Sequence, residues 1–123
     1  MKVILDTNAL ILSAEFGVDL FSELSRLNFG EIFVPRAVVR ELNGLSKNLK
    51  GQKRTAVNVA ISFLDRCKIV EVDGDADEVI LKLAKEKDAA VFTNDKELNQ
   101  KLVKAGVSII IIRQKRYLSF GKI

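Results

Sequence analysis

Acidic and amide side chains follow two apolar segments that lie far apart in the chain. Asp6 follows the apolar residues 3–5, and Asp95 stands in the polar turn after the apolar residues 89–92. Short runs of Val, Ile, Leu and Ala are typical of strands buried on both faces of a parallel sheet, and each polar turn opens a helical pattern. Ligands bind at the carboxyl ends of the strands in such sheets, so we expect Asp6 and Asp95 to meet there.

Two further carboxylates are candidates for the same place. Glu41 lies in a helix expected after the second strand, and Asp77 lies in the first turn of a helix expected after the third. Two carboxylates ~4 Å apart repel by about 4 kcal/mol at an effective dielectric constant near 20, and a bound cation relieves this repulsion. Because carboxylate oxygens suit hard divalent cations, the cluster predicts Mg²⁺ or Mn²⁺ and favours a metal-dependent phosphodiesterase.

Three other acids near Asp77 have competing explanations. Asp75 and Glu78 have the spacing of a helix capping box, and Asp73 precedes Gly74 in a predicted turn. We therefore expect Asp75 to be a cap and Asp73 to be a turn residue. Glu78 stays open between a first-turn acid that favours the helix dipole, a capping partner and an outer ligand of the site.

The absence of histidine excludes several classes of enzyme. The chain has no histidine and one cysteine, Cys67. Catalysis by Ser-His-Asp or Cys-His groups is excluded, and so is a zinc site of the usual Cys/His kind. A single cysteine allows no internal disulfide and suits a reducing cytoplasm. Any chemistry must therefore use carboxylates, lysines and hydroxyls.

The formal net charge is +4, and the positive charge gathers in two blocks that flank the acidic segments. A negative pocket between basic segments suits an enzyme that acts on a polyanion, so these blocks are candidate RNA contacts. The alternative is that they are only solvated surface. The candidate contacts are Lys47, Lys50, Lys53, Arg54, Arg113, Lys115 and Arg116.

Strands and helices alternate along the chain. Strands are expected at 2–5, 32–34, 68–72, 89–92 and 107–112, with helices between them. This alternation predicts a single α/β domain over residues 1–123, a three-layer α/β/α sandwich around a mainly parallel five-stranded sheet. Residues 113–123 are expected to form a basic C-terminal tail. The longest apolar stretch is too short to cross a bilayer and no signal-peptide pattern is found, so we expect a cytoplasmic protein without a membrane partner.

Four acidic segments together resemble those of PIN-domain ribonucleases. Their order and spacing agree with the family over nearly the whole chain. The four segments are Asp6-Thr7-Asn8-Ala9-Leu10, Pro35-x-x-Val38-x-x-Glu41-Leu42, Ala76-Asp77 followed by Ile80 and Ala84, and Thr93-Asn94-Asp95-Lys96-Glu97-Leu98.

The resemblance implies an Mg²⁺- or Mn²⁺-dependent endoribonuclease with a PIN-like fold. Its metal ligands would be Asp6, Glu41, Asp77 and Asp95. Thr7, Asn8, Thr93 and Asn94 would be neighbours that shape the site. The third motif reads Asp77-Glu78, where two aspartates are common in the branch of the family that processes ribosomal RNA. The third metal ligand is therefore either Asp77 or Glu78, and Asp77 is favoured.

The end of the chain bears on the branch of the family. Residues 107–118 resemble the archaeal relatives of the small-subunit processome PIN nuclease, which implies ribosomal RNA processing, RNA as substrate and ribosome-assembly partners. VapC-type toxins usually lack this basic tail; that alternative implies an antitoxin partner. The family also implies a possible homodimer.

Two alternatives outside these nucleases stay open. A phosphoryl-accepting receiver domain shares the architecture, but it needs a pair of acids after the first strand and a lysine where Arg113 stands. A non-catalytic RNA or protein docking module would use the same acids and basic blocks without chemistry.

Overall fold

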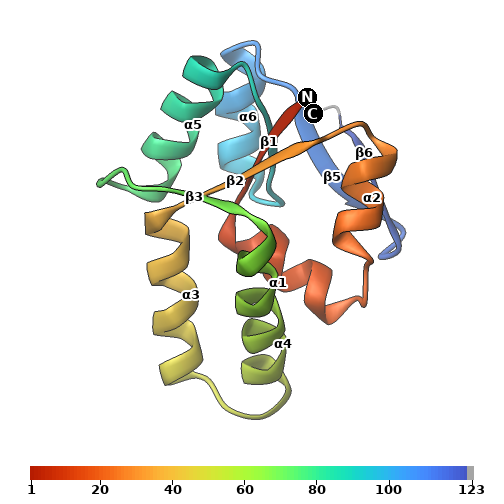
Figure 1. The fold of residues 1–123 in the computed structure, drawn as a ribbon, viewed down its shortest axis with the longest axis vertical. Helices are drawn as coiled ribbons and strands as arrows, with labels where there is room; N and C mark the ends of the chain where they lie inside the picture. The colour runs from red at the N-terminus through yellow and green to blue at the C-terminus, as the bar shows by residue number, and fades with distance from the viewer. Residues whose placement is uncertain (122–123) are drawn as a thin grey trace.

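A six-stranded sheet forms the centre of the computed structural model, which describes residues 1–121 (Figure 1). The strands lie in the order β3-β2-β1-β4-β5-β6. The elements, in chain order, are β1 (Lys2–Leu5), α1 (Thr7–Glu15), α2 (Leu20–Arg26), β2 (Glu31–Pro35), α3 (Arg36–Asn48), α4 (Gly51–Ser62), the 3₁₀ turn η1 (Phe63–Arg66), β3 (Lys68–Val70), α5 (Ala76–Lys87), β4 (Ala90–Phe92), α6 (Lys96–Lys104), β5 (Ile109–Arg113) and β6 (Tyr117–Phe120).

The first five strands are parallel and their centre is buried. Val3, Ile4 and Leu5 of β1 have no exposed surface, and β1 pairs with β2 on one side and β4 on the other. Continuous apolar residues suit a strand that has helices against both faces. The predicted α/β fold with a mainly parallel central sheet is confirmed.

The strand order places the helices on two faces. From β1 the chain moves outward to β2 and β3, then returns to β4 on the other side of β1 and continues to β5. Right-handed crossovers in opposite directions put the intervening helices on opposite faces. Accordingly α1 packs with α3 and α4, whereas α5 packs with α6. The strand order reverses between β1 and β4, and a crevice opens at the carboxyl ends of strands at such a point.

Aspartate side chains cap four of the helices, and Asp19 does so for α2. Asp6, Asp75 and Asp95 accept backbone N–H groups at the starts of α1, α5 and α6, respectively. The predicted cap at Asp75 is confirmed, with its Oδ2 3.4 Å from the Glu78 nitrogen. Pro35 ends β2 and immediately precedes α3, one position earlier than the helical position expected for it. Two of the candidate metal ligands thus also begin helices.

The prediction of five strands missed β6, which forms within the expected basic tail. Tyr117–Phe120 pairs antiparallel with β5, and Leu118 is fully buried. The chain reverses through Gln114 and Lys115, which have φ angles of 53° and 55°. The basic side chains Arg113, Lys115 and Arg116 are therefore exposed around a hairpin turn. Residues 122–123 of the expected tail lie outside the described residues.

Side chains of α2 hold the outer side of β6. The Leu118 N–H donates to Glu23 Oε1 at 2.9 Å, and Arg26 Nη2 donates to the Leu118 carbonyl oxygen at 2.6 Å. Glu23 and Arg26 also pair with each other at 3.0 Å. The buried Leu118 thus has both of its peptide groups bonded to one helix.

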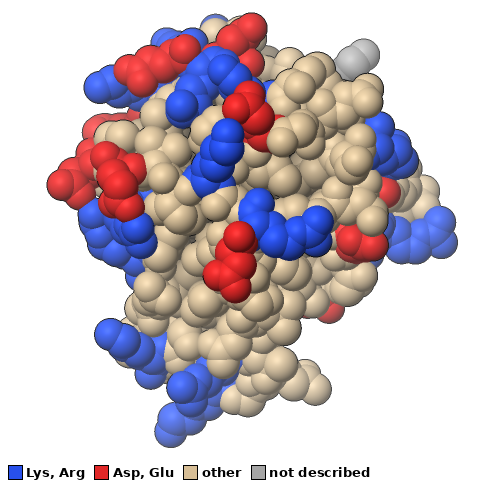
Figure 2. Space-filling view, in the orientation of Figure 1, with Lys and Arg blue, Asp and Glu red and all other residues tan. Residues whose placement is uncertain are grey.

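The helices α3 and α4 form a hairpin that projects away from the sheet (Figure 1). Lys47, Lys50, Lys53 and Arg54 are exposed around its tip, where Figure 2 shows basic side chains gathered. Ser46 Oγ and Asn58 Oδ1, 2.6 Å apart, join the two helices near that end. In the described residues, no helix is both long enough and apolar enough to cross a membrane.

Candidate active site

Asp6 lies at the centre of the crevice between β1 and β4. Its backbone N–H donates to the Phe92 carbonyl oxygen at 3.0 Å, which fixes the end of β1 beside the end of β4. The side chain is only 6% exposed. Oδ1 accepts the Thr7 N–H at 2.8 Å, and Oδ2 accepts the Thr93 hydroxyl at 2.8 Å. Each carboxylate oxygen accepts more than one bond, so both keep capacity for a further ligand.

The loop after β4 is joined to Asp6 through Thr93. The Thr93 hydroxyl is buried and accepts the Asp95 N–H at 3.1 Å while it donates to Asp6. Asn8 Oδ1 accepts the Asn94 N–H at 2.9 Å and lies 3.3 Å from the Thr93 hydroxyl. The residues expected to shape the site therefore form one hydrogen-bonded network between α1 and the β4–α6 loop.

Burial and neighbouring charge both act on Asp6. Burial raises the pKa of Asp6 above its ordinary value, and the negative charges of Glu41 and Asp95 raise it further. The hydrogen bonds from Thr93 and from the Thr7 N–H act in the opposite direction on this pKa. Asp6 is thus a carboxylate whose charge is costly without a nearby cation.

Asp77 feels the same acidic surroundings from the start of α5. Its partial burial raises its pKa, and the charges of Asp6, Asp95 and Asp75 add to this rise, whereas Lys101 opposes it. Asp6 therefore interacts electrostatically with each of the other three acids expected at the site. Glu41 does so from an exposed position on α3. Glu78 is exposed, and its backbone N–H donates to the Asp75 side chain that caps α5.

The acids do not form a closed metal cage. Within residues 1–121, no three side chains of the metal-binding kinds Asp, Glu, Cys or His lie close enough together to hold an ion directly. The donor set is nevertheless all oxygen, which suits a hard cation. Mg²⁺ keeps several waters and is commonly held by only one or two carboxylates. Asp6 with one neighbouring acid fits such a partly hydrated ion, whose charge would offset the mutual repulsion.

Asn99 is a buried member of this network that the sequence did not reveal. It is 5% exposed on α6, and its Nδ2 donates to the Thr93 carbonyl oxygen at 3.1 Å. Two buried side-chain atoms, Asn99 Oδ1 and Thr7 Oγ1, have no hydrogen-bond partner among the described residues. The sequence feature that could have indicated burial of Asn99 is its position next to the apolar Leu98, one helical turn after the Asp95 cap.

The second basic block lies on the β5–β6 turn. Arg113 Nε donates to the Ser119 hydroxyl at 2.8 Å, and Lys115 Nζ lies 5.4 Å from the centre of the Phe16 ring at the end of α1. Arg113, Lys115 and Arg116 are all exposed. Both basic blocks are therefore available for contacts with a polyanion, and their role as RNA contacts stays a prediction.

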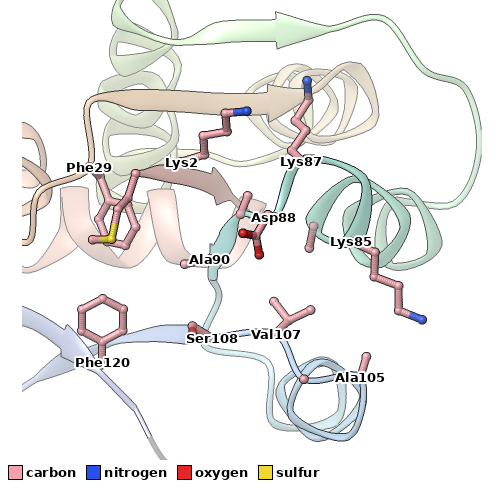
Figure 3. A pocket seen from close by; sticks show the side chains of 14 residues that line it. Lys2, Phe29, Lys85, Lys87, Asp88, Ala90, Ala105, Val107, Ser108 and Phe120 are labelled. Carbon is pink, nitrogen blue, oxygen red and sulfur yellow. The ribbon is translucent and has the colours of Figure 1, made fainter.

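A pocket of about 680 Å³ lies at the opposite, amino ends of the strands (Figure 3). Figure 3 shows the Asp88 side chain near its middle and the rings of Phe29 and Phe120 at one end. Its lining includes Lys2 at the start of β1 and Ala90 at the start of β4. This cavity is therefore separate from the carboxylates, which occupy the other end of the same strands.

Comparison with known proteins places these features in a family. Residues 3–115 match the family described as PIN like domain. Ribonuclease VapC4 of Methanocaldococcus jannaschii is 37% identical over 129 residues, covering 99% of this chain and 98% of that protein. Ribonuclease VapC9 of Archaeoglobus fulgidus is 26% identical over 113 residues, covering 92% and 84%.

Solved structures support the same fold. The PIN domain endonuclease Utp24 superposes with a TM-score of 0.76 at 24% identity, covering 99% of this chain and 92% of that chain. VapBC2 from Rickettsia felis, bound to a DNA fragment from its promoter, gives a TM-score of 0.58 at 20% identity, covering 81% and 92%. At these identities the likeness concerns the fold alone. The family match together with the full-length sequence relative shows that this chain belongs to the PIN-like domain family.

Proposed function

We propose that the protein is a metal-dependent endoribonuclease that hydrolyses RNA phosphodiester bonds. The observation that carries this proposal is Asp6, a buried carboxylate at the point where the strand order reverses, with three acids in its electrostatic surroundings. The chain has no histidine, so these carboxylates are the groups available for catalysis. Membership of the PIN-like family and the names of the VapC relatives agree with this chemistry.

Each side chain has a distinct part in the proposed reaction. Asp6, directly after β1, and Asp95, in the β4–α6 loop, would hold the ion, and Thr93 keeps the Asp6 carboxylate oriented by its 2.8 Å hydrogen bond. Bound Mg²⁺ or Mn²⁺ lowers the pKa of water and offsets charge on the phosphate. Glu41 or Asp77, both at least partly exposed, would accept a proton from the water that attacks phosphorus, while the bond from phosphorus to the leaving oxygen breaks and solvent protonates that oxygen. No serine or threonine acts as a nucleophile.

The basic blocks hold the RNA backbone in this proposal. The tip of the α3–α4 hairpin and the β5–β6 turn each present exposed lysine and arginine side chains. Contacts of this kind release counterions from the nucleic acid, so binding weakens steeply with salt and carries little sequence information. Recognition of a particular RNA therefore requires further contacts or a partner.

Two biological settings fit the same chemistry. The basic C-terminal segment favours ribosomal RNA processing with ribosome-assembly partners in the cytoplasm. The 37% identity to Ribonuclease VapC4 over nearly the whole chain favours a toxin-type ribonuclease with an antitoxin partner. Since the sequence relatives are of the VapC kind and the Utp24 likeness concerns the fold alone, the toxin setting has the more direct support.

Cleavage of single-stranded and structured RNA tests the chemistry. The purified chain is incubated with Mg²⁺, with Mn²⁺ and with EDTA, beside the variants Asp6→Asn and Asp73→Asn. Asp73 is 90% exposed and pairs with Arg40 at 2.6 Å, so its neutralisation is a matched control. We expect metal-dependent cutting that Asp6→Asn abolishes and Asp73→Asn retains. Salt-sensitive RNA binding without cutting would instead favour a docking module.

Expression in a bacterial host separates the two settings. A toxin-type enzyme should arrest growth when Asp6 is intact and should cleave a narrow set of RNAs. A processing enzyme should leave growth unaffected and cut precursor ribosomal RNA at a defined position. Mapping of RNA 5′ ends after induction distinguishes the two patterns.

A further inference from the structure

Another pocket, of about 310 Å³, lies between α6 and β5 beside the proposed active site. Isoleucine side chains and side-chain amides make up most of its lining: Ile109, Ile111 and Ile112 from β5, with Asn94, Asn99 and Gln100 from the loop and helix after β4. Lys96 is the one charged residue in this lining. The combination suits a flat, uncharged group with polar edges rather than an ion.

The position of the pocket connects it with the carboxylates. Asn94 lines the pocket, and its backbone N–H donates to Asn8 within the network around Asp6. The Thr93 hydroxyl donates a hydrogen bond to Asp6, and the Thr93 carbonyl oxygen accepts one from Asn99 Nδ2 at 3.1 Å. A nucleotide whose phosphate lies at the carboxylates can therefore direct its base toward this pocket.

Asn99 supplies independent evidence that a ligand belongs here. Its Nδ2 bond to Thr93 fixes which end of the amide is nitrogen, so the remaining group is the Oδ1 acceptor. The side chain is 95% buried, and Oδ1 has no partner among the described residues. Asn99 lines the pocket, and its Oδ1 is enclosed in the free protein. Buried polar groups are nearly always hydrogen-bonded, so this unpartnered acceptor points to a ligand that brings a donor when the pocket opens around it.

We propose that this pocket binds a base of the RNA next to the cleaved phosphate, with Asn99 Oδ1 accepting a hydrogen from an exocyclic amino group. The inference rests on the proposed ribonuclease function and adds a base-selecting subsite to it. Adenine and cytosine carry an exposed amino group on the pairing edge. The only pairing-edge donor of uracil lies between two carbonyl oxygens, which the Asn99 oxygen repels. The isoleucines contact the face of the base, and Lys96 contacts a neighbouring phosphate.

Oligonucleotide binding with Ca²⁺ in place of Mg²⁺ tests the subsite without requiring cleavage, because Ca²⁺ also takes carboxylate ligands and offsets their repulsion of the phosphate. Fluorescence anisotropy measures the affinity of the wild-type chain for short adenine, cytosine and uracil homopolymers at one salt concentration. One hydrogen bond gained in a buried site corresponds to ~2- to 10-fold in affinity, so adenine and cytosine oligomers should bind tighter than uracil oligomers by this factor. Equal affinity for all three would overturn the inference.

Two variants test whether this pocket causes the preference among bases, and a third serves as a control. Asn99→Leu should bind the three oligomers equally. Because this variant also loses the bond to Thr93, Ile111→Glu provides a second probe on the half-buried floor and should weaken adenine and cytosine binding. Val103→Glu, at a position on α6 that is 44% exposed and outside the pocket lining, should change nothing. Unchanged binding by Ile111→Glu would overturn the assignment of the pocket to RNA.

The outcome separates the two proposals. Base preference that depends on Asn99 supports the subsite even if no RNA is cleaved, in which case the proposed nuclease activity fails alone. Metal-dependent cleavage with no base preference in binding leaves the nuclease proposal standing and overturns the subsite.

Discussion

Replacement of Thr93 by valine should destabilise the metal-free protein by an amount that follows from two hydrogen bonds. The side chain has no exposed surface, and valine has nearly the same shape. The substitution removes the 2.8 Å donor to the Asp6 carboxylate and the acceptor of the Asp95 N–H at 3.1 Å. The remaining Asp6 carboxylate stays buried with one donor, from the Thr7 N–H.

The expected loss is about 2–4 kcal/mol in the free energy of unfolding. A hydrogen bond to a charged group contributes about 1.5–3 kcal/mol, and a neutral one contributes about 1 kcal/mol. For a chain of 123 residues, an unfolding entropy of roughly 2 cal/mol/K per residue converts each kcal/mol to about 4 °C in Tm. Thr93→Val should therefore lower Tm by roughly 8–15 °C.

Thr7→Val is the matched control in the same site. Thr7 is 6% exposed, and its Oγ1 is buried without a partner among the described residues. Replacing an unsatisfied hydroxyl with a methyl group removes a desolvation cost and adds apolar contact. Thr7→Val should therefore be neutral or stabilising by up to about 1 kcal/mol.

Urea unfolding in EDTA, followed by circular dichroism, measures both variants against the wild-type chain. The reasoning requires a clear difference in stability between two identical Thr→Val changes at residues that both donate a hydrogen bond to Asp6. Equal destabilisation by the two variants would refute it, and so would a loss of less than about 0.5 kcal/mol in Thr93→Val.

Three further results are expected. The pKa of Asp6 in the folded protein lies above its ordinary value of 3.8, so the folded state binds this proton more tightly than the unfolded state. The free energy of unfolding of the metal-free wild type should therefore fall as pH rises from 3.8 through the raised pKa. Urea titrations at several pH values should show this fall in the wild type and a flatter dependence in Asp6→Asn. Leu118→Ala should lower the free energy of unfolding by about 2–5 kcal/mol because this fully buried side chain packs β6 against the core. Thermal unfolding measures this loss, and a loss near zero would mean that β6 is not packed as described. Arg40→Gln breaks only an exposed pair with Asp73 and should change the free energy of unfolding by less than about 1 kcal/mol, a limit that the same unfolding assay tests.

The sheet and its order of elements could be predicted because the first five strands each contain a continuous apolar run. Residues 3–5 and 90–92 are buried on both faces, and no alternation is needed to recognise them. The last strand, β6, could not be recognised in the same way. Its turn places Gln114 and Lys115 at positive φ, where glycine or asparagine is the usual signal, and the surrounding basic residues are typical of a solvated tail.

The candidate site was predictable in its residue types but not in its contacts. An apolar strand followed by an acidic turn and a helix predicts the place of Asp6 and Asp95, since carboxyl ends of parallel strands meet. The sequence does not distinguish a capping carboxylate from a metal ligand, and both residues do cap helices here. The role of Asn99 depends on its distance from Thr93, which only the packing of α6 against the sheet determines.

The bonds between α2 and Leu118 have a consequence for how the molecule meets other copies of itself. The outermost strand of an open sheet normally offers free N–H and C=O groups, which act as a template for strands of other chains and promote aggregation. Here Glu23 and Arg26 already occupy both groups at the middle of β6. An incoming strand would have to displace this ion pair before it gained a bond at the middle of β6, so the chain hinders the growth of its own sheet at this edge. Replacing Glu23 and Arg26 together with alanine should increase light scattering on mild heating, and unchanged scattering would contradict this role.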